Sequence, residues 1–347
     1  MTDVAVIGRL LDEYHERSVP PASIEIVAGS EHEGRITYKL TLTDGSAQVV
    51  RAFRAEGAVP LEMRGPFTET VPDWLVGRAR TLAVLAEAGY GSPRPVLTRT
   101  GELVAVAGPW LAWATTYIPG SVLTPTRDQL HALGEALGRL HQVIAGGHRA
   151  SLSPRHPAVA VPMTLSRLDE VADKVPGEWA GMCSTFRQTA LSVDAAAPSV
   201  PETVVHADAW ARNSVEPAGG GGRAVLIDWQ KSGLGLAVLD LGNSLMECHL
   251  NSAASSLDPE AWLIAPDEDR IAATASGYAS ARTLSAAELD LLPDAVRFST
   301  AVVGAIHVEL ALAEGVGGPT MDARLARLEN RLAIANEVAA LAVPYLS

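Results

Sequence analysis

Cysteine is scarce in this chain. Its 347 residues include only Cys183 and Cys248, too few for a disulfide framework or a cysteine-bound metal cluster, so we expect a reducing, cytoplasmic location. The sequence also lacks internal repeats, a G-x-S-x-G serine elbow and an H-E-x-x-H metal helix. Their absence argues against repeat architectures and against the two hydrolase classes that these motifs identify.

We also expect neither a targeting segment nor a membrane-spanning segment. Asp3 and Arg9 interrupt the apolar residues near the N-terminus, which argues against a signal peptide. The longest apolar run, residues 103–118, contains Gly108 and Pro109 and is too short to span a bilayer. We therefore expect no membrane partner.

Basic residues are in the minority. Lys and Arg number 27 against 40 Asp and Glu, and the net charge of −13 at pH 7 argues against nucleic-acid binding. The imbalance is concentrated after residue 120, where 16 basic residues stand against 26 acidic ones, compared with 11 and 14 before it. A negative cleft would attract a cationic small molecule, although acidic surfaces are equally an ordinary solubilising feature.

The chain does contain one informative polar motif. His206, Asp208 and Asn213 have the spacing H-x-D-x-x-x-x-N, and a glycine-rich turn and a short apolar run then lead to Asp228. This is the spacing of a phosphoryl-transfer loop and its metal-binding aspartate. Phosphoryl transfer needs in-line positioning and neutralisation of charge on the phosphate oxygens more than covalent help from the protein.

Each residue of the motif suits one task in such a reaction. Asp208 would accept the hydrogen bond of the attacking hydroxyl. Asn213 and Asp228 would bind Mg²⁺, which prefers a few hard oxygen ligands together with waters and phosphates. His206 fits a hydrogen-bonding strut better than an acid or base. The glycines Gly219–Gly222 would let the chain reverse between two short strands.

These motifs resemble the aminoglycoside phosphotransferase family, kinase-like enzymes that also include choline, homoserine and sugar kinases. The family's H-G-D-x-x-x-x-N loop matches His206–Asn213, with Ala207 in place of the usual glycine. Its I-D-[WFL] motif matches Ile227–Trp229, and its D-L-[AG] motif matches Asp240–Gly242. By motif the resemblance runs from about Ile24 to Leu250.

The resemblance implies an α+β, two-lobed protein-kinase-like fold. A small N-terminal lobe with an antiparallel sheet (residues 1–116) would bind the nucleotide, and residues 117–120 would form a hinge. A larger, mainly helical C-terminal lobe (residues 121–347) would carry the catalytic loop and the acceptor site. The implied cofactors are ATP, or GTP, and Mg²⁺. The oligomeric state is not readable from the sequence.

Apolar periodicity and turn residues predict the individual elements. Expected strands cover residues 23–28, 35–43, 47–53 and 103–116, with Asp44-Gly45 as a hairpin turn, and expected helices cover residues 3–17, 72–87 and 126–145. Residues 151–162 are predicted to be a loop, 166–192 one or two helices and 193–202 a linker. Further helices are expected over 240–251, 266–282, 285–314 and 319–341.

In kinase-like folds the third strand carries a cation for the α- and β-phosphates, and this family often uses arginine. Arg51 is the preferred candidate and Arg54 the alternative. Strand alternation places the two on opposite faces, so only one can face the nucleotide. The family's partner glutamate on the next helix aligns with Arg78, so either the helix is shifted or another acid, such as Glu69 or Asp73, holds the cation.

The strand that ends at Thr116 resembles the family's hinge, where backbone groups of Thr116 and Ile118 would bind the purine edge. His141, at the end of a predicted helix, fits a packed structural residue better than a catalytic one. Candidate acceptor-pocket residues lie in the C-terminal helices, with no single one favoured: Glu247, His249, Trp262, Asp267, Glu268, His307 and Glu309.

We therefore predict a small-molecule kinase that acts on a hydroxyl of an aminoglycoside, an amino sugar or another hydroxylated antibiotic or metabolite. Two alternatives remain. A non-catalytic, kinase-like nucleotide-binding protein is disfavoured by the intact loop but weakly favoured by the missing helix glutamate. A metal-dependent hydrolase would use His206, Asp208 and His249, and would need no nucleotide.

Overall fold

The computed structural model describes residues 3–14, 21–30, 34–55, 71–143, 149, 152–155, 157–249, 264–314 and 319–347. The chain divides into two compact units. Unit 1 comprises Met1–Pro119 and Gly147–Ser153, and unit 2 comprises Gly120–Gly146 and Pro154–Ser347. The main chain thus passes from the first unit to the second between Pro119 and Gly120.

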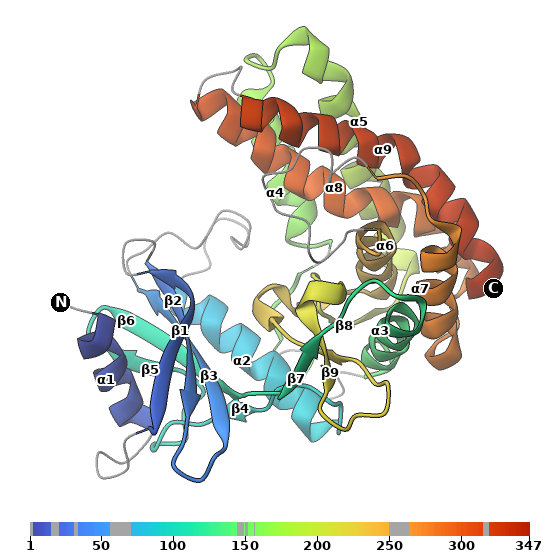
Figure 1. Ribbon diagram of the computed structural model, residues 1–347. Coiled ribbons are helices and arrows are strands. Elements are labelled where there is room, and N and C mark those ends of the chain that lie inside the picture. Colours follow the sequence, from blue (N-terminus) through green and yellow to red (C-terminus); the bar gives the residue numbers. More distant parts are fainter. Residues whose placement is uncertain are drawn as a thin grey trace. The chain divides into compact units, whose positions relative to one another are not determined.

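Unit 1 is built on an antiparallel sheet (Figure 1) with the strand order β1-β2-β3-β6-β4, and β5 also pairs with β6. The strands are β1 (Ser23–Ser30), β2 (Arg35–Thr41), β3 (Ala47–Arg54), β4 (Pro95–Val96), β5 (Ala105–Ala107) and β6 (Trp110–Thr116). The helices of this unit are α1 (Asp3–Tyr14) and α2 (Val71–Glu87).

The two faces of this sheet pack against different helices, because alternate residues of a strand point to opposite sides. Val50 of β3 belongs to a buried apolar cluster that includes Leu10 of α1. Phe53, on the opposite face of β3, contacts Trp74 of α2 edge-on, with ring centroids 5.0 Å apart. The sheet therefore lies between α1 and α2.

A tight turn joins β2 to β3. The Asp44 carboxylate accepts hydrogen bonds from the Ser46 N–H at 2.9 Å and from the Ser46 hydroxyl at 2.6 Å. Gly45 has a φ of +81°, a conformation that glycine adopts without steric cost. The hairpin predicted from Asp44-Gly45 is confirmed.

Unit 2 contains two small antiparallel sheets. One has the order β10-β9-β7, and the other pairs β11 with β8. The strands are β7 (Gly120–Val122), β8 (Glu202–Val205), β9 (Ser214–Pro217), β10 (Val225–Leu226) and β11 (Gly233–Leu236). β9 and β10 flank the Gly219–Gly222 turn, so the predicted chain reversal is confirmed.

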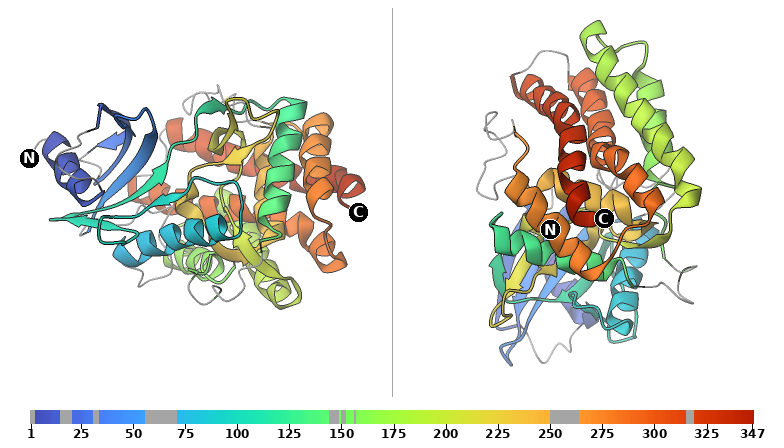
Figure 2. Two further views of the ribbon diagram at one scale, coloured as in Figure 1. Left: turned by 90° about the horizontal axis from the view of Figure 1, so that it is seen from below. Right: turned by 90° about the vertical axis from the view of Figure 1, so that its right-hand side faces the viewer.

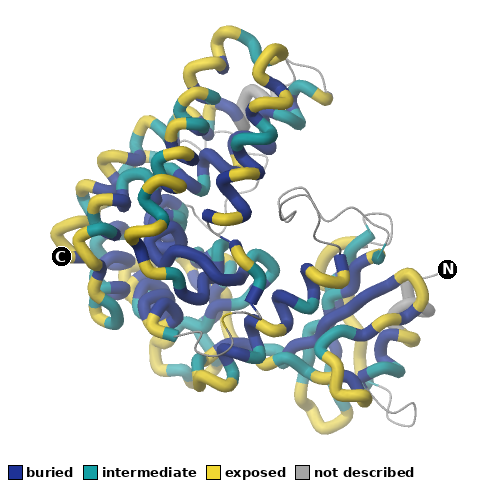
Figure 3. The backbone as a smooth tube through the Cα atoms, turned by 180° about the vertical axis from the view of Figure 1, so that it is seen from behind, coloured by how far each residue is buried: buried dark blue, intermediate teal, exposed yellow. Residues whose placement is uncertain are grey.

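The rest of the described part of unit 2 is mainly helical (Figure 2). The helices are α3 (Arg127–Leu140), α4 (Ala160–Val171), α5 (Gly177–Ala196), α6 (Ala237–Glu247), α7 (Glu268–Ala281), α8 (Ala286–Glu314) and α9 (Pro319–Leu346). α3 lies along α7, and α8 packs against α4, α5, α6 and α9. Figure 3 shows that buried residues follow one side of most of these helices.

α8 is a core helix of this unit. It shares a buried apolar cluster with α4, α5 and α9, and Gly304 lies so close to Phe186 of α5 that an added Cβ would stand 2.2 Å from the ring. Among the described helices it alone is long and apolar enough to cross a membrane. Because 61% of its most apolar stretch is buried inside the protein, packing accounts for that composition.

Several predicted boundaries were wrong. α4 begins at Ala160, inside the predicted loop, and α5 continues to Ala196, into the predicted linker. Pro162 is tolerated there because the first turn of a helix needs no N–H donor. Buried Val161 and Val193 extend the apolar faces of these helices, and that packing outweighs the local loop signals. α9 likewise continues beyond residue 341 to Leu346.

Candidate active site

A buried carboxylate holds the start of the predicted catalytic loop, which follows β8. Asp240 Oδ2 accepts a hydrogen bond from the His206 N–H at 2.6 Å, and Oδ1 accepts one from the Ala207 N–H at 3.0 Å. Asp240 lies in the first turn of α6 and is fully buried. Burial alone would raise its pKa, but the hydrogen bonds from the His141 ring and the His206 backbone hold that pKa below its usual value.

His206 connects this loop to the segment that carries Asp228. Its imidazole is fully buried, and Nε2 lies 2.8 Å from the Ile227 carbonyl oxygen, to which it must donate. The ring also packs edge-on against Trp229, with centroids 4.6 Å apart. The predicted role of His206 as a strut is confirmed.

Two residues at the candidate site have a left-handed backbone. Ala207 and Asp228 both have a φ of +62°, and they are the non-glycine residues with positive φ in the described part of the chain. This conformation costs an L-residue about 1–2 kcal/mol, and strain of this kind concentrates at functional sites. The positive φ explains physically why the family resemblance places glycine at position 207.

Asp208 is held by two neighbours. The Asn213 side-chain amide donates to the Asp208 carbonyl oxygen at 3.0 Å and to its Oδ2 at 2.9 Å. Lys231 Nζ lies 3.1 Å from Asp208 Oδ1. The carboxylate is about a quarter exposed, at 28%, so it is oriented by these contacts and still accessible to a small molecule.

Lys231 is a site residue that sequence reasoning missed. It ends a short 3₁₀ turn, Trp229–Lys231, that directly follows Asp228. Its only sequence signal is this position three residues after the predicted metal ligand. The turn brings the Lys231 ammonium group to the carboxylate of Asp208, the aspartate of the H-x-D motif.

Asn213 and Asp228 are brought together by backbone pairing, because the Ile227 N–H donates to the Asn213 carbonyl oxygen at 2.8 Å. The Asn213 side-chain NH₂ donates to Asp208, so a cation could be bound only through the amide oxygen. One amide oxygen and one carboxylate are hard donors of the kind that Mg²⁺ takes. These residues therefore fit the predicted cation, and their role as ligands stays a prediction.

The two strand arginines lie on opposite faces of the unit 1 sheet. Arg51 pairs across the ladder with Trp113, and its guanidinium lies 5.8 Å from that ring, on the face that also carries Phe53. Arg54 pairs with Trp110, on the α1 face, at 5.4 Å. The predicted alternation is confirmed, and Arg51, not Arg54, shares the α2 face.

The family pattern places a glutamate on the helix that follows the third strand, and this chain departs from that pattern. Arg78, at the position of the family's glutamate, is 1% exposed in the middle of α2. Asp73 lies in the first turn of that helix and is exposed. Glu69 lies outside the described residues. A second cation, not an acid, therefore occupies the centre of this helix.

The two predicted hinge residues differ in their backbone bonding. The Thr116 N–H donates to the Arg94 carbonyl oxygen at 2.9 Å, so this residue could contact a purine only through its carbonyl group. Ile118 follows the end of β6, and its backbone makes no hydrogen bond with the described part of the chain. Of the two, Ile118 is therefore the better donor for a purine.

Three of the seven candidate acceptor residues make ion pairs or a capping hydrogen bond. Glu247 is ion-paired with Arg331, and Glu309 with Arg167. Asp267 caps α7 by accepting from the Arg270 N–H at 3.1 Å. The remaining candidates are Glu268, in the first turn of α7, the half-buried His307 and Trp262, which lies outside the described residues.

His249 is buried, and burial lowers its pKa to about 4. No group of three or more His, Cys, Asp or Glu in the described residues is arranged to hold a metal ion. The hydrolase alternative, which would use His206, Asp208 and His249 together, therefore gains no support from this part of the structure.

Comparison with solved structures identifies the fold. An amicoumacin kinase in complex with AMP-PNP and Ca²⁺ matches with a TM-score of 0.65 and 14% identity, over 97% of this chain and 94% of that one. A choline kinase from Cryptosporidium parvum Iowa II gives 0.62 and 12%, over 99% of both chains. An aminoglycoside phosphotransferase from Alicyclobacillus acidocaldarius gives 0.61 and 12%, over 99% and 97%.

No curated protein matches the sequence. The sequence model of the phosphotransferase enzyme family, in contrast, matches residues 33–284, more than half of the chain. This stretch contains the loop from His206 to Asn213, Asp228 and Asp240. The predicted kinase-like α+β fold and the predicted class of small-molecule kinase are both confirmed, and the chain belongs to the phosphotransferase enzyme family.

Proposed function

We propose that this enzyme transfers the γ-phosphoryl group of a nucleoside triphosphate, with Mg²⁺, to a hydroxyl of a small molecule. Asp208 orients and deprotonates that hydroxyl. Asn213 and Asp228 hold the cation, which when bound neutralises charge on the phosphate oxygens. Arg51 contacts the α- and β-phosphates. The Thr116 carbonyl group and the Ile118 N–H bind the purine edge.

The observation that carries this proposal is the fixed orientation of Asp208. One carboxylate oxygen accepts from Asn213, and the other lies 3.1 Å from Lys231. The proposed base and a proposed metal ligand are thus hydrogen-bonded to each other. A hydroxyl bound at the base and a phosphate bound at the cation would therefore keep a fixed position relative to each other. In-line transfer requires such fixed positioning.

The acceptor that we favour carries positive charge and a hydroxyl, such as an amino sugar, an aminoglycoside or an amino alcohol. Residues 121–347 hold 26 acidic against 16 basic side chains, and such an excess attracts cations. The solved structures of similar fold include kinases named for choline and for amicoumacin. Choline is an alcohol with a permanent positive charge, so this part of the proposal is chemically consistent with that neighbour.

The first experiment is nucleotide consumption with ATP or GTP and Mg²⁺ across a panel of acceptors: aminoglycosides, amino sugars, choline, other amino alcohols, homoserine and macrolides. We expect turnover with a cationic acceptor, and a fall in kcat of at least about 10²–10⁴-fold in Asp208→Ala, the usual contribution of a positioned base. Nucleotide affinity should stay near that of the wild type, since Asp208 is not a proposed nucleotide contact.

Two results would contradict the proposal. Full turnover in Asp208→Ala would remove the assigned base. Tight nucleotide binding without acceptor-dependent turnover across the panel would favour the non-catalytic nucleotide-binding alternative.

A further inference from the structure

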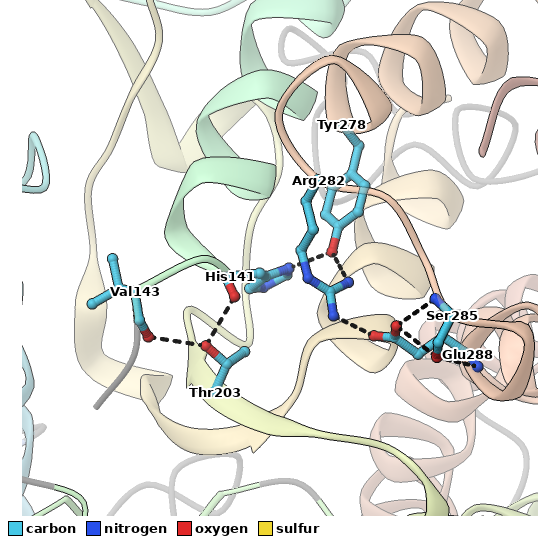
Figure 4. Close-up of polar contacts among 7 residues, drawn as sticks. All are labelled: His141, Val143, Thr203, Tyr278, Arg282, Ser285 and Glu288. Carbon is cyan, nitrogen blue, oxygen red and sulfur yellow. Dashed lines mark hydrogen bonds and ion pairs between the residues drawn. The ribbon is translucent and has the colours of Figure 1, made fainter. Parts of the chain in front are cut away.

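A continuous row of polar side chains, all buried except the partly buried Arg282, runs from α8 to the catalytic loop. It consists of Glu288, Arg282, Tyr278, His141 and Asp240, and we call it the buried relay. Figure 4 shows all of its members except Asp240. Its side chains come from α8, from α7 and the residue after it, from the residue after α3, and from α6. None of them belongs to the H-x-D or I-D motifs.

Each neighbouring pair in the buried relay is in contact. Arg282 Nη2 lies 2.6 Å from Glu288 Oε1, and Nη1 lies 2.8 Å from the Tyr278 hydroxyl. That hydroxyl is 2.9 Å from His141 Nδ1. His141 Nε2 is 3.3 Å from Asp240 Oδ2. Asp240 in turn accepts from the backbone of His206 and Ala207.

The chemistry of the side chains gives these bonds a direction. A guanidinium group can only donate, so Tyr278 accepts from Arg282 and its own proton is available for His141. The Asp240 carboxylate can only accept, so His141 must carry a proton on Nε2. Burial lowers the pKa of His141 by more than Asp240 raises it. The lowered pKa favours the neutral ring. A neutral ring with Nε2–H presents an unprotonated Nδ1, the acceptor that the Tyr278 hydroxyl requires.

The ends of the buried relay are anchored. Glu288 accepts a second bond from the Ser285 N–H at 2.9 Å and is 1% exposed. Burial opposes the charge of Arg282, but its bonds to Tyr278 and Glu288 hold its pKa above the ordinary value. Beside His141, the Thr203 hydroxyl bonds to the His141 carbonyl oxygen at 3.1 Å and fixes the backbone there (Figure 4).

We propose that Tyr278 and Arg282 are positioning residues that fix His141 in its Nε2–H tautomer. In that form His141 holds Asp240 where it binds the first two amides of the catalytic loop. The orientation of the loop thus depends on side chains from α7 that do not contact the reacting groups. The consequence for turnover rests on the proposed function, whereas the tautomer of His141 does not.

The first test reads the tautomer directly. In protein labelled with ¹⁵N-histidine, long-range ¹H–¹⁵N spectra separate protonated from unprotonated ring nitrogens. We expect one buried histidine with a protonated Nε2 and a hydrogen-bonded, unprotonated Nδ1, whose Nδ1 resonance shifts in Tyr278→Phe and does not shift in the control Tyr345→Phe. Tyr345 is a matched control because it lies on α9 and is exposed.

The second test is kinetic. In Tyr278→Phe we expect kcat to fall about tenfold or more, with the nucleotide KM within about twofold of the wild-type value, since loop geometry and not nucleotide binding is disturbed. Arg282→Lys should lower kcat in the same direction, because a lysine reaches Glu288 without the paired donors of a guanidinium.

A wild-type His141 protonated on Nδ1, or on both nitrogens, would overturn the proposal. So would unchanged spectra and kcat in Tyr278→Phe. The expected tautomer in a protein that turns over no acceptor would support the buried relay and count against the proposed function instead. If Tyr278→Phe fails to fold, the wild-type spectrum and the kinetics of Arg282→Lys still test the proposal.

Discussion

Lys231 and Asp208 form a charged contact at the proposed chemistry, at 3.1 Å. We predict that Lys231→Met lowers kcat by about 10²-fold, because the carboxylate then keeps only the Asn213 amide and can rotate away from the productive orientation. Steady-state kinetics with the acceptor found in the panel would measure this change.

Lys174→Met is the matched control for this prediction. Lys174 is an exposed lysine of the same unit, so its replacement should leave kcat within about twofold, as expected for a surface substitution. Equal activity of Lys231→Met and wild type would show that Asn213 alone orients Asp208.

Ala207 carries backbone strain that glycine would not. We predict that Ala207→Gly raises the free energy of unfolding by about 0.5–1 kcal/mol. Relief of the left-handed penalty of about 1–2 kcal/mol exceeds the added chain entropy of glycine in the unfolded state. Urea denaturation would show a higher midpoint with an unchanged slope. A lower midpoint would mean that the Ala207 methyl group contributes packing that outweighs the strain.

At this scale the sequence indicated candidates for the chemistry, whereas it gave little sign of the residues that support them. Asp208 and Asn213 could be proposed because their spacing matches that of a phosphoryl-transfer loop. Lys231 and Tyr278 could not, because each acquires its partner only through tertiary contacts. Arg78 shows the opposite case, in which a resemblance leads to an acid and the chain supplies a buried cation.

At the scale of elements, α3 and α7 approach each other through glycines. A Cβ on Gly277 would stand 2.0 Å from the His131 carbonyl oxygen, and one on Gly134 would stand 2.1 Å from that of Thr274. We predict that Gly277→Ala lowers the free energy of unfolding by about 1–3 kcal/mol, the usual result of overpacking, because backbone atoms must move. Urea denaturation would measure this loss.

Gly181→Ala provides the control. Gly181 lies in α5 with nothing within 4 Å of an added Cβ. The same change there should stabilise the protein by up to about 1 kcal/mol through helix propensity. Similar effects of the two substitutions would show that the α3–α7 contact relaxes without loss.

The elements that the sequence predicted well are those with long periodic patterns. α2 and α8 were placed within a residue or two, because each buries one apolar face over several turns. β4, β7 and β11 have two to four residues each, too few to show an alternation. These short strands form because other strands pair with them, and that pairing arises only in the folded chain.

At the scale of the whole molecule, buried neutral histidines predict acid sensitivity. The pKa of His249 is lowered to about 4 by burial, and that of His141 is also lowered by burial. The unfolded chain would take up these protons near pH 6.5, before the native protein does. Stability should therefore fall as the pH drops from about 6.5 towards 4, with His249 alone contributing at most about 3 kcal/mol.

Urea denaturation at several pH values would measure this slope. His249→Gln should flatten it, whereas His131→Gln, at an exposed position of α3, should leave it unchanged. An unaltered slope in His249→Gln would assign the acid sensitivity to other groups.

The Asp240 carboxylate limits how the H-x-D loop could be grafted onto another protein. The two backbone amides that begin the loop are satisfied by Asp240, which lies 34 positions after His206, in α6. A graft of His206–Asn213 onto another scaffold would carry the reactive groups without that acceptor, and would leave two polar groups unsatisfied in a closed interior. The smallest portable unit therefore runs from the loop through Asp228 to the start of α6, and a designer of a minimal phosphotransferase should transplant that whole stretch.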